Sequence, residues 1–196
     1  MGTLTKIYTN EKKESVYALE HLGLLLKQLS KDPYYWKWAI LAIHNCFHNF
    51  MVATLMNTHG LLVQENKSNN NNIWMNIFYS CNEEDDEDFD FFLGLYDKLK
   101  GPHMDQTMES KRLITKKRQD ESIYKLHTLH NQLIVYTPWN CELNPLELPI
   151  IFIDCLDIIR FLAFESNNIY WSEFMPEHRC RSALEYCEKK INYFKF

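Results

Sequence analysis

The sequence predicts an all-α fold, and two observations carry this prediction. Apolar residues recur three and four positions apart over most of the chain, which is the spacing of one helix face. The alternation of apolar and polar residues that marks a half-buried strand is scarce. Because 46% of the 196 residues are hydrophobic, the chain can bury one sizeable core. We therefore expect a single-domain helical bundle over residues 1–196.

Two long helices open the predicted bundle. The first is expected from about Glu14 to Leu29, where leucines recur at helical spacing. Asp32-Pro33 then provides an N-cap and a proline at the first helical position. A second helix is expected from Pro33 to about Asn57, closed by His59-Gly60. The short link between the two predicts an antiparallel hairpin.

The middle of the chain is less regular and is expected to form an insertion at about 61–90. It contains an asparagine run at 68–72, an apolar segment at 73–79 that suits a helix or a strand, and a nearly continuous acidic stretch at 83–90. The acidic stretch could pair with basic residues of another subunit, mimic nucleic acid or solubilise a loop. A helical stripe from Phe89 to Leu99 follows and ends at Gly101-Pro102.

Three helices are expected in the second half. One runs from about Asp120 to Tyr136 and is stopped by Pro138. The segment from Pro145 to Pro149 leads into a buried helix that ends near Glu165. A C-terminal extension at about 167–196 carries an amphipathic helix from Glu177 to Tyr193.

Charge and cysteine usage narrow the function classes. The net charge of −5 gives no overall positive field to attract nucleic acid, so such a contact needs a local patch. The apolar run from Leu148 to Phe164 is interrupted by Asp154, Asp157 and Arg160, which argues against a membrane span. Met1 to Lys13 lacks the apolar core of a signal peptide. Six cysteines without a CxxC pair then predict reduced thiols in a cytoplasmic protein, with Cys46 and Cys155 as small core residues.

Four segments together resemble the HEPN-like family of all-helical bacterial proteins. Trp36–Asn45 is similar to the second helix of that family, and Phe92–Lys98 to its middle helix. Ser122–Tyr136 is similar to its motif helix, and Asp154–Leu162 to its closing helix. The resemblance covers about residues 14–165. It implies a bundle that often dimerises, with metal-independent RNA cleavage in toxin–antitoxin or phage-defence settings.

The motif of active family members is an arginine, a polar residue and, some residues later, a histidine. The resemblance puts His130 at the arginine position, Asn131 at the polar position and Val135 at the histidine position. Histidine can exchange a proton near neutral pH, and arginine can hold a phosphate with two donors. Valine can do neither, and loss of a general acid–base group typically costs about two to four orders of magnitude in rate.

The chain is therefore expected to be a non-catalytic RNA- or protein-binding, regulatory component without a cofactor. We expect a homodimer or a hetero-oligomer with a neighbouring-gene product. Two alternatives stay open. One is an active endoribonuclease with a displaced catalytic set of His127, His130 and Asn131, helped by Tyr136. The other is a structural partner subunit that has kept the bundle for packing alone.

Two histidine pairs extend the predicted site. His44 and His48 lie four apart on the second helix, and His127 and His130 lie three apart on the motif helix, so each pair shares a face. If the faces meet, four imidazoles could surround a metal ion. We nevertheless predict no metal, because HExxH, CxxC and clustered carboxylates are missing from the sequence around them. The residues expected to line the cleft are His44, Asn45, His48 and Tyr136.

A run of cations precedes the motif helix. This run could bind the phosphate backbone of RNA near the cleft. Alternatively, it is an ordinary solvent-exposed loop without a binding role. The residues are Lys111, Arg112, Lys116, Lys117 and Arg118.

Overall fold

The computed structural model describes residues 9–56, 91–134, 143–173 and 175–194. These ranges contain six α-helices and no strand beyond an isolated bridge between Ser172 and Met175, which confirms the all-α prediction. The predicted insertion at 61–90, the helix end at His59-Gly60 and Pro138 lie outside the described residues.

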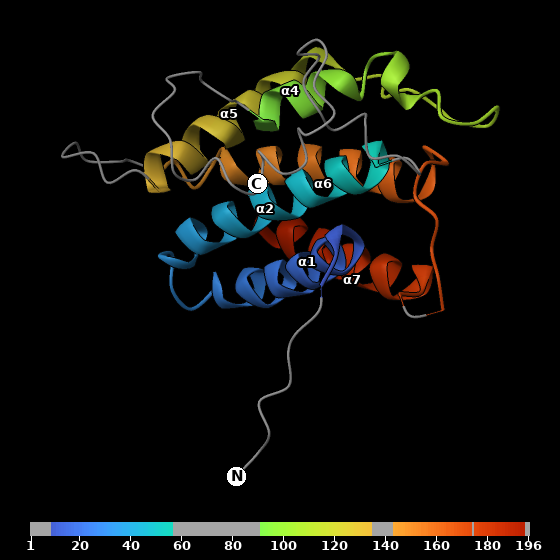
Figure 1. Cartoon of the computed structure of the whole chain (residues 1–196). Helices are drawn as coiled ribbons and strands as arrows, with labels where there is room; N and C mark the ends of the chain where they lie inside the picture. The colour runs from blue at the N-terminus through green and yellow to red at the C-terminus, as the bar shows by residue number, and fades with distance from the viewer. Residues whose placement is uncertain (1–8, 57–90, 135–142, 174, 195–196) are drawn as a thin grey trace, which may run out of the picture.

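The helices pack as three layers of two (Figure 1). The central layer contains α2 (Tyr35–Leu55) and α6 (Leu148–Phe164). On one side lie α1 (Glu11–Gln28) and α7 (Glu177–Ile191), and on the other lie α4 (Phe91–Lys98) and α5 (Lys117–Ile134). Two short 3₁₀ helices follow α4 and α7, η3 at Pro102–Met104 and η4 at Asn192–Phe194.

The central helix α6 is apolar on nearly every side because helices cover it from both flanking layers. Its Phe152 packs edge-on against Trp36 of α2, with ring centroids 5.4 Å apart. Asp154 is fully buried in this helix. Its carboxylate accepts hydrogen bonds from Arg118 and Ser122 of α5, each at 2.7 Å, so a paired charge ties α5 to α6.

Side-chain caps place two helix starts earlier than the apolar pattern predicts. Asn10 accepts a hydrogen bond from the Lys13 backbone N–H, so α1 begins at Glu11 and not at Glu14. The Gln119 side chain accepts from the Lys116 N–H at 3.0 Å, so α5 begins at Lys117. Two residues of the expected basic loop, Lys117 and Arg118, are therefore helical.

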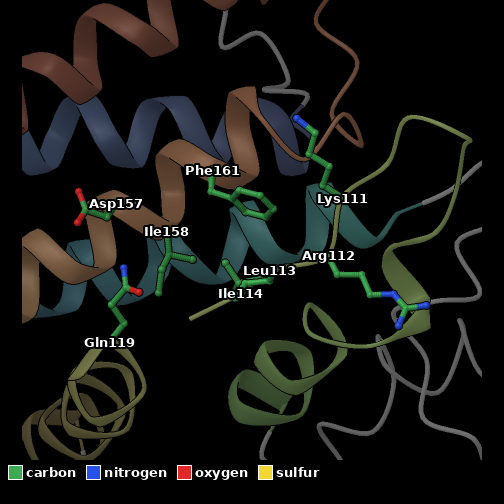
Figure 2. A pocket seen from close by; sticks show the side chains of 8 residues that line it. All are labelled: Lys111, Arg112, Leu113, Ile114, Gln119, Asp157, Ile158 and Phe161. Atoms are coloured by element: carbon green, nitrogen blue, oxygen red, sulfur yellow. The ribbon is translucent and has the colours of Figure 1, made fainter. Parts of the chain in front are cut away.

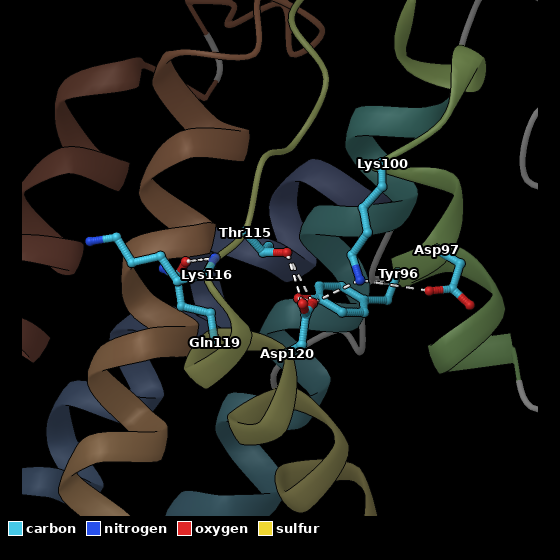
Figure 3. A network of polar contacts seen from close by, with 7 residues as sticks. All are labelled: Tyr96, Asp97, Lys100, Thr115, Lys116, Gln119 and Asp120. Atoms are coloured by element: carbon cyan, nitrogen blue, oxygen red, sulfur yellow. Dashed lines mark hydrogen bonds and ion pairs between the residues drawn. The ribbon is translucent and has the colours of Figure 1, made fainter.

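The first turn of α5 is anchored to α4 by a polar network around Asp120 (Figure 3). The carboxylate accepts from the Tyr96 hydroxyl and the Lys100 ammonium, each at 2.8 Å, and from the Thr115 hydroxyl at 3.0 Å. Burial opposes the charge of Asp120, but these donors hold its pKa below the usual value. The network fixes the position of α5, which carries most of the predicted site.

The cysteines in the described part of the chain are buried and unpaired, as predicted for Cys46 and Cys155. Cys46 of α2 and Cys187 of α7 contact α1 from two sides, through the backbone carbonyls of Ser15 (3.6 Å) and Leu19 (3.3 Å). Burial raises the pKa of both thiols. Within the described ranges, no helix combines the length and apolarity that a membrane crossing needs.

Candidate functional site

The predicted histidine faces of α2 and α5 meet. We define the histidine cluster as His44 from α2, His127, His130 and Asn131 from α5, and Phe92 from α4. Nε2 of His44 lies 3.1 Å from Nδ1 of His127, although 83 positions separate these residues in sequence. Side chains from three helices therefore lie together in this cluster.

The His44 ring is enclosed between two other rings. Its centroid lies 3.9 Å from that of Phe92, with an interplanar angle of 14°. The His130 ring is equally parallel, at 3.5 Å and 11°. Two parallel rings this close to a third must lie on its opposite faces. The side chain of His44 is accordingly buried, and substrate cannot approach either ring face.

The hydrogen bonds of the cluster define one consistent set of neutral tautomers. The amide nitrogen of Asn131 donates to Nε2 of His127 at 3.1 Å, so neutral His127 carries its proton on Nδ1. That N–H then donates to Nε2 of His44. Nδ1 of His130 donates to the amide oxygen of Asn131, also at 3.1 Å. A second proton on the ring of His44 or His127 would place two N–H groups opposite each other, so that one of these hydrogen bonds would be lost.

Electrostatics favour the same neutral state. Burial, followed by the neighbouring His130, His127 and His48, lowers the pKa of His44 to about 2. Burial also lowers the pKa values of His48 and His130. A neutral His130 cannot take over the phosphate-binding charge of an arginine, and a base as weak as His44 cannot accept a proton near pH 7.

The remaining predicted cleft residues divide into two groups. Asn45 is exposed on α2, and His48 is half-buried one turn further along. Tyr136 and Val135 lie outside the described residues, so the assignment of the motif's histidine position to Val135 stays a prediction. Among the residues that are described, no three His, Cys, Asp or Glu side chains are arranged to hold a metal ion.

The predicted RNA-binding segment is exposed, but three of its five cations already contact acids. Arg112 donates from Nε to Asp105 at 2.9 Å, and Lys117 lies 3.8 Å from Glu121. Arg118 reaches the buried Asp154. The segment's other two cations, Lys111 and Lys116, are exposed and form no ion pair with a described residue.

Sequence reasoning missed an open groove of about 460 Å³ between this segment and α6 (Figure 2). Asp157 and Gln119 lie at one end of the groove, and Lys111 and Arg112 lie at the other. The apolar residues between the two ends are Leu113, Ile114, Ile158 and Phe161. The signal in the sequence was Asp157, a charged residue within an apolar run. Such a charge argues against a membrane span, but it also marks a polar position on the surface of α6.

The carboxylate of Asp157 is in an unfavourable environment. Burial, and then the carboxylates of Asp154 and Glu188, raise its pKa above the usual value. Arg118 and Arg160 oppose this rise, but Arg118 bonds Asp154, and Arg160 bonds Glu188 at 3.0 Å. The nearest cations are thus engaged elsewhere.

Comparisons of the chain with models of protein families, with curated proteins and with solved structures find no match.

Proposed function

We propose that this chain is a non-catalytic, regulatory component that binds a partner protein. The observation that carries the proposal is the closed hydrogen-bonding pattern of the histidine cluster. The rings of His44 and His127 are bonded to each other, and Asn131 bonds both His127 and His130. Such groups stabilise the joint between α2 and α5, and they leave little acid–base capacity for RNA cleavage.

The choice of a protein over RNA rests on charge. Most cations of the exposed segment already pair with acids, and the chain carries a net charge of −5. RNA affinity depends mainly on cations that can contact phosphates. A groove with an apolar floor and opposite charges at its ends suits a polypeptide better.

The proposal includes the HEPN-like relationship, a cytoplasmic location and a role in phage defence or a toxin–antitoxin system. It also includes assembly as a homodimer or with the product of a neighbouring gene. Trp38 and Tyr34, exposed at the start of α2 with 55% and 85% of their surfaces accessible, are available for such an interface.

A cleavage assay tests the non-catalytic part. Purified protein is incubated with end-labelled RNA beside the His127→Ala and His130→Ala variants. We expect identical, background-level degradation in all three samples. Cleavage by the unmodified protein that either substitution abolishes would overturn the proposal and restore the displaced catalytic set of His127, His130 and Asn131.

Co-expression tests the binding part. The chain is produced with each neighbouring-gene product, and the purified mixture is analysed by size-exclusion chromatography with light scattering. A complex of defined stoichiometry with one of them supports the proposal. A chain that stays monomeric with every neighbour and by itself contradicts it.

A second candidate function, RNA binding without cleavage, is favoured by one observation. The five cations at positions 111–118 are all solvent-exposed, and Lys111 and Lys116 are available for phosphates. If they bind RNA, the double variant Lys111→Gln with Lys116→Gln should reduce the slope of log affinity against log salt by roughly one to two. The matched control is Lys189→Gln, an exposed lysine on α7.

A further inference from the structure

We infer that the groove is a peptide-binding site that accepts an extended partner segment with a basic side chain, apolar side chains and an acidic side chain in that spatial order. The basic side chain would contact Asp157, the apolar ones the groove floor and the acidic one Lys111. This inference rests on the proposed function, because it names the kind of partner segment that the protein binds.

Among the described residues, no cation forms an ion pair with Asp157 at the acidic end of the groove. The side chain of Asp157 reaches the surface, but partial burial, and then the carboxylates of Asp154 and Glu188, raise its pKa. The two arginines near it are already bonded to those other carboxylates. A lysine or arginine from a partner would relieve this local excess of negative charge.

The basic end offers a cation that is not committed. Arg112 is held by Asp105 through both its Nε and terminal nitrogens, whereas Lys111 pairs with no described acid. In Figure 2, Lys111 and Asp157 lie at opposite ends of the groove with Phe161 between them. Opposite charges at the two ends favour one orientation of a charged peptide over the reverse.

The floor is apolar, and one wall is unusually exposed. Leu113 and Ile158 form a buried base, with 5% and 1% of their surfaces accessible. Ile114 stands beside them with 92% of its surface in water. Covering this side chain and the partly buried Phe161 would remove apolar surface from water, which favours binding.

Hydrogen bonds hold the segment that forms one wall of the groove in place. The backbone N–H of Lys111 donates to the Ser166 carbonyl at 3.0 Å, and that of Leu113 donates to the Leu99 carbonyl at 2.9 Å. Gln119 holds the end of the segment through the Lys116 N–H. A pre-formed site avoids part of the ordering cost of binding. Its volume of about 460 Å³ lies in the usual range for ligand sites and suits a few residues of extended chain.

A defined peptide tests the inference by nuclear magnetic resonance. The probe is acetyl-Lys-Leu-Leu-Glu-amide, together with its reversed sequence because the chain direction is open. We expect the better of the two to shift the signals of Ile158, Phe161 and Ile114. Replacing the probe's lysine by glutamine should weaken binding about two- to fivefold.

A charge exchange supplies the decisive control. Asp157→Lys should weaken binding of the lysine-containing probe and improve binding of acetyl-Glu-Leu-Leu-Glu-amide. Glu173→Lys, which makes the same charge change at an exposed acid outside the groove lining, should leave both affinities unchanged. Equal effects of the two variants, or no groove signals shifted by any probe, would overturn the inference. If a neighbouring-gene product still forms a complex in that case, the proposed function stands and only the groove assignment fails.

Discussion

Two regions of the molecule, the histidine cluster and the groove, use their polar groups in opposite ways. In the histidine cluster, His127, His130 and Asn131 of α5 satisfy one another and His44, and burial favours the neutral forms of His44 and His130. In the groove, the carboxylate of Asp157 on α6 lies near other acids without a direct cationic partner among the described residues. The molecule therefore combines a polar cluster that stabilises the fold with a groove whose charged end adds little to stability.

This difference indicates which polar groups of the molecule are available to bind a ligand. A group that already has its hydrogen-bond partners gains little from a ligand, whereas a charge in poor surroundings gains from any complementary one. The residues that most resemble a catalytic set are thus the less promising ligand contacts.

The largest effect is expected at the ion pair between Asp154 of α6 and Arg118 of α5. Asp154→Ala leaves the buried Ser122 hydroxyl without its acceptor and removes the partner of Arg118. We expect the free energy of unfolding, measured with urea at pH 7, to fall by about 2–4 kcal/mol. The control is Asp97→Ala, an acid on α4 whose side chain is 64% exposed and whose contact with Lys100 spans 3.8 Å. A change below about 0.5 kcal/mol is expected there, and equal losses in both variants would contradict the prediction.

The next effect concerns acid sensitivity of the histidine cluster. Because the folded-state pKa of His44 lies near 2, below the usual 6.5, the unfolded chain binds the proton first as the pH falls. Stability is thus complete above about pH 6.5 and declines below it. Between pH 6.5 and 4.5 His44 alone should cost about 2–3 kcal/mol. Carboxylates with lowered pKa values, such as Asp120, contribute only at more acidic pH.

Urea unfolding at pH 6.5 and at pH 4.5 measures this contribution of His44 to the free energy of unfolding. His44→Leu should flatten the decline between pH 6.5 and 4.5 by that amount, whereas His21→Leu, at an exposed position on α1, should leave it unchanged. An unaltered slope in the His44 variant would show that the cluster tolerates protonation.

A smaller effect is expected from Asn131→Leu. This change removes the donor to His127 Nε2, so the proton of His127 should redistribute from Nδ1 towards Nε2. The nitrogen-15 chemical shifts of the ring report this tautomer directly. The stability loss should be about 0.5–1.5 kcal/mol. The control is Asn45→Leu, at an exposed position on α2, which should leave the nitrogen-15 chemical shifts of the His127 ring unchanged.

The smallest effect is expected at the groove. Asp157→Asn removes a carboxylate whose pKa is raised by burial and by neighbouring acids, so stability at pH 7 should stay level or rise by up to about 0.5 kcal/mol. The thermal unfolding midpoint measures it. A loss above about 1 kcal/mol would mean that Asp157 is a structural residue, and the contrast between the histidine cluster and the groove would disappear.

The sequence predicts the helices well because their apolar spacing is local information. The expected and observed ends of the buried helix α6 differ little. Local spacing places each histidine pair on one face of its helix, whereas the contact between His44 and His127 depends on how α2 and α5 pack. The early starts of α1 and α5 depend on single capping side chains, Asn10 and Gln119, which an apolar pattern does not weigh.

The site was only partly predictable, for a different reason. The acids that occupy Arg112 and Arg118 lie 7 and 36 positions away in sequence, and nothing local to the basic segment indicates those pairs. The insertion of Phe92 against His44 likewise depends on how α4 packs. The groove arises from the crossing of an extended segment with α6, so its lining exists only in three dimensions.

The unpaired cysteines of the core have one practical consequence. Cys46 and Cys187 approach α1 from different helices, and their raised pKa values keep the reactive thiolate form scarce while the bundle is closed. Alkylating reagents can therefore modify them only when the surrounding helices separate. Mass spectrometry of each labelled site over time would show whether α7 detaches before α2, and so reveal the order in which this domain comes apart.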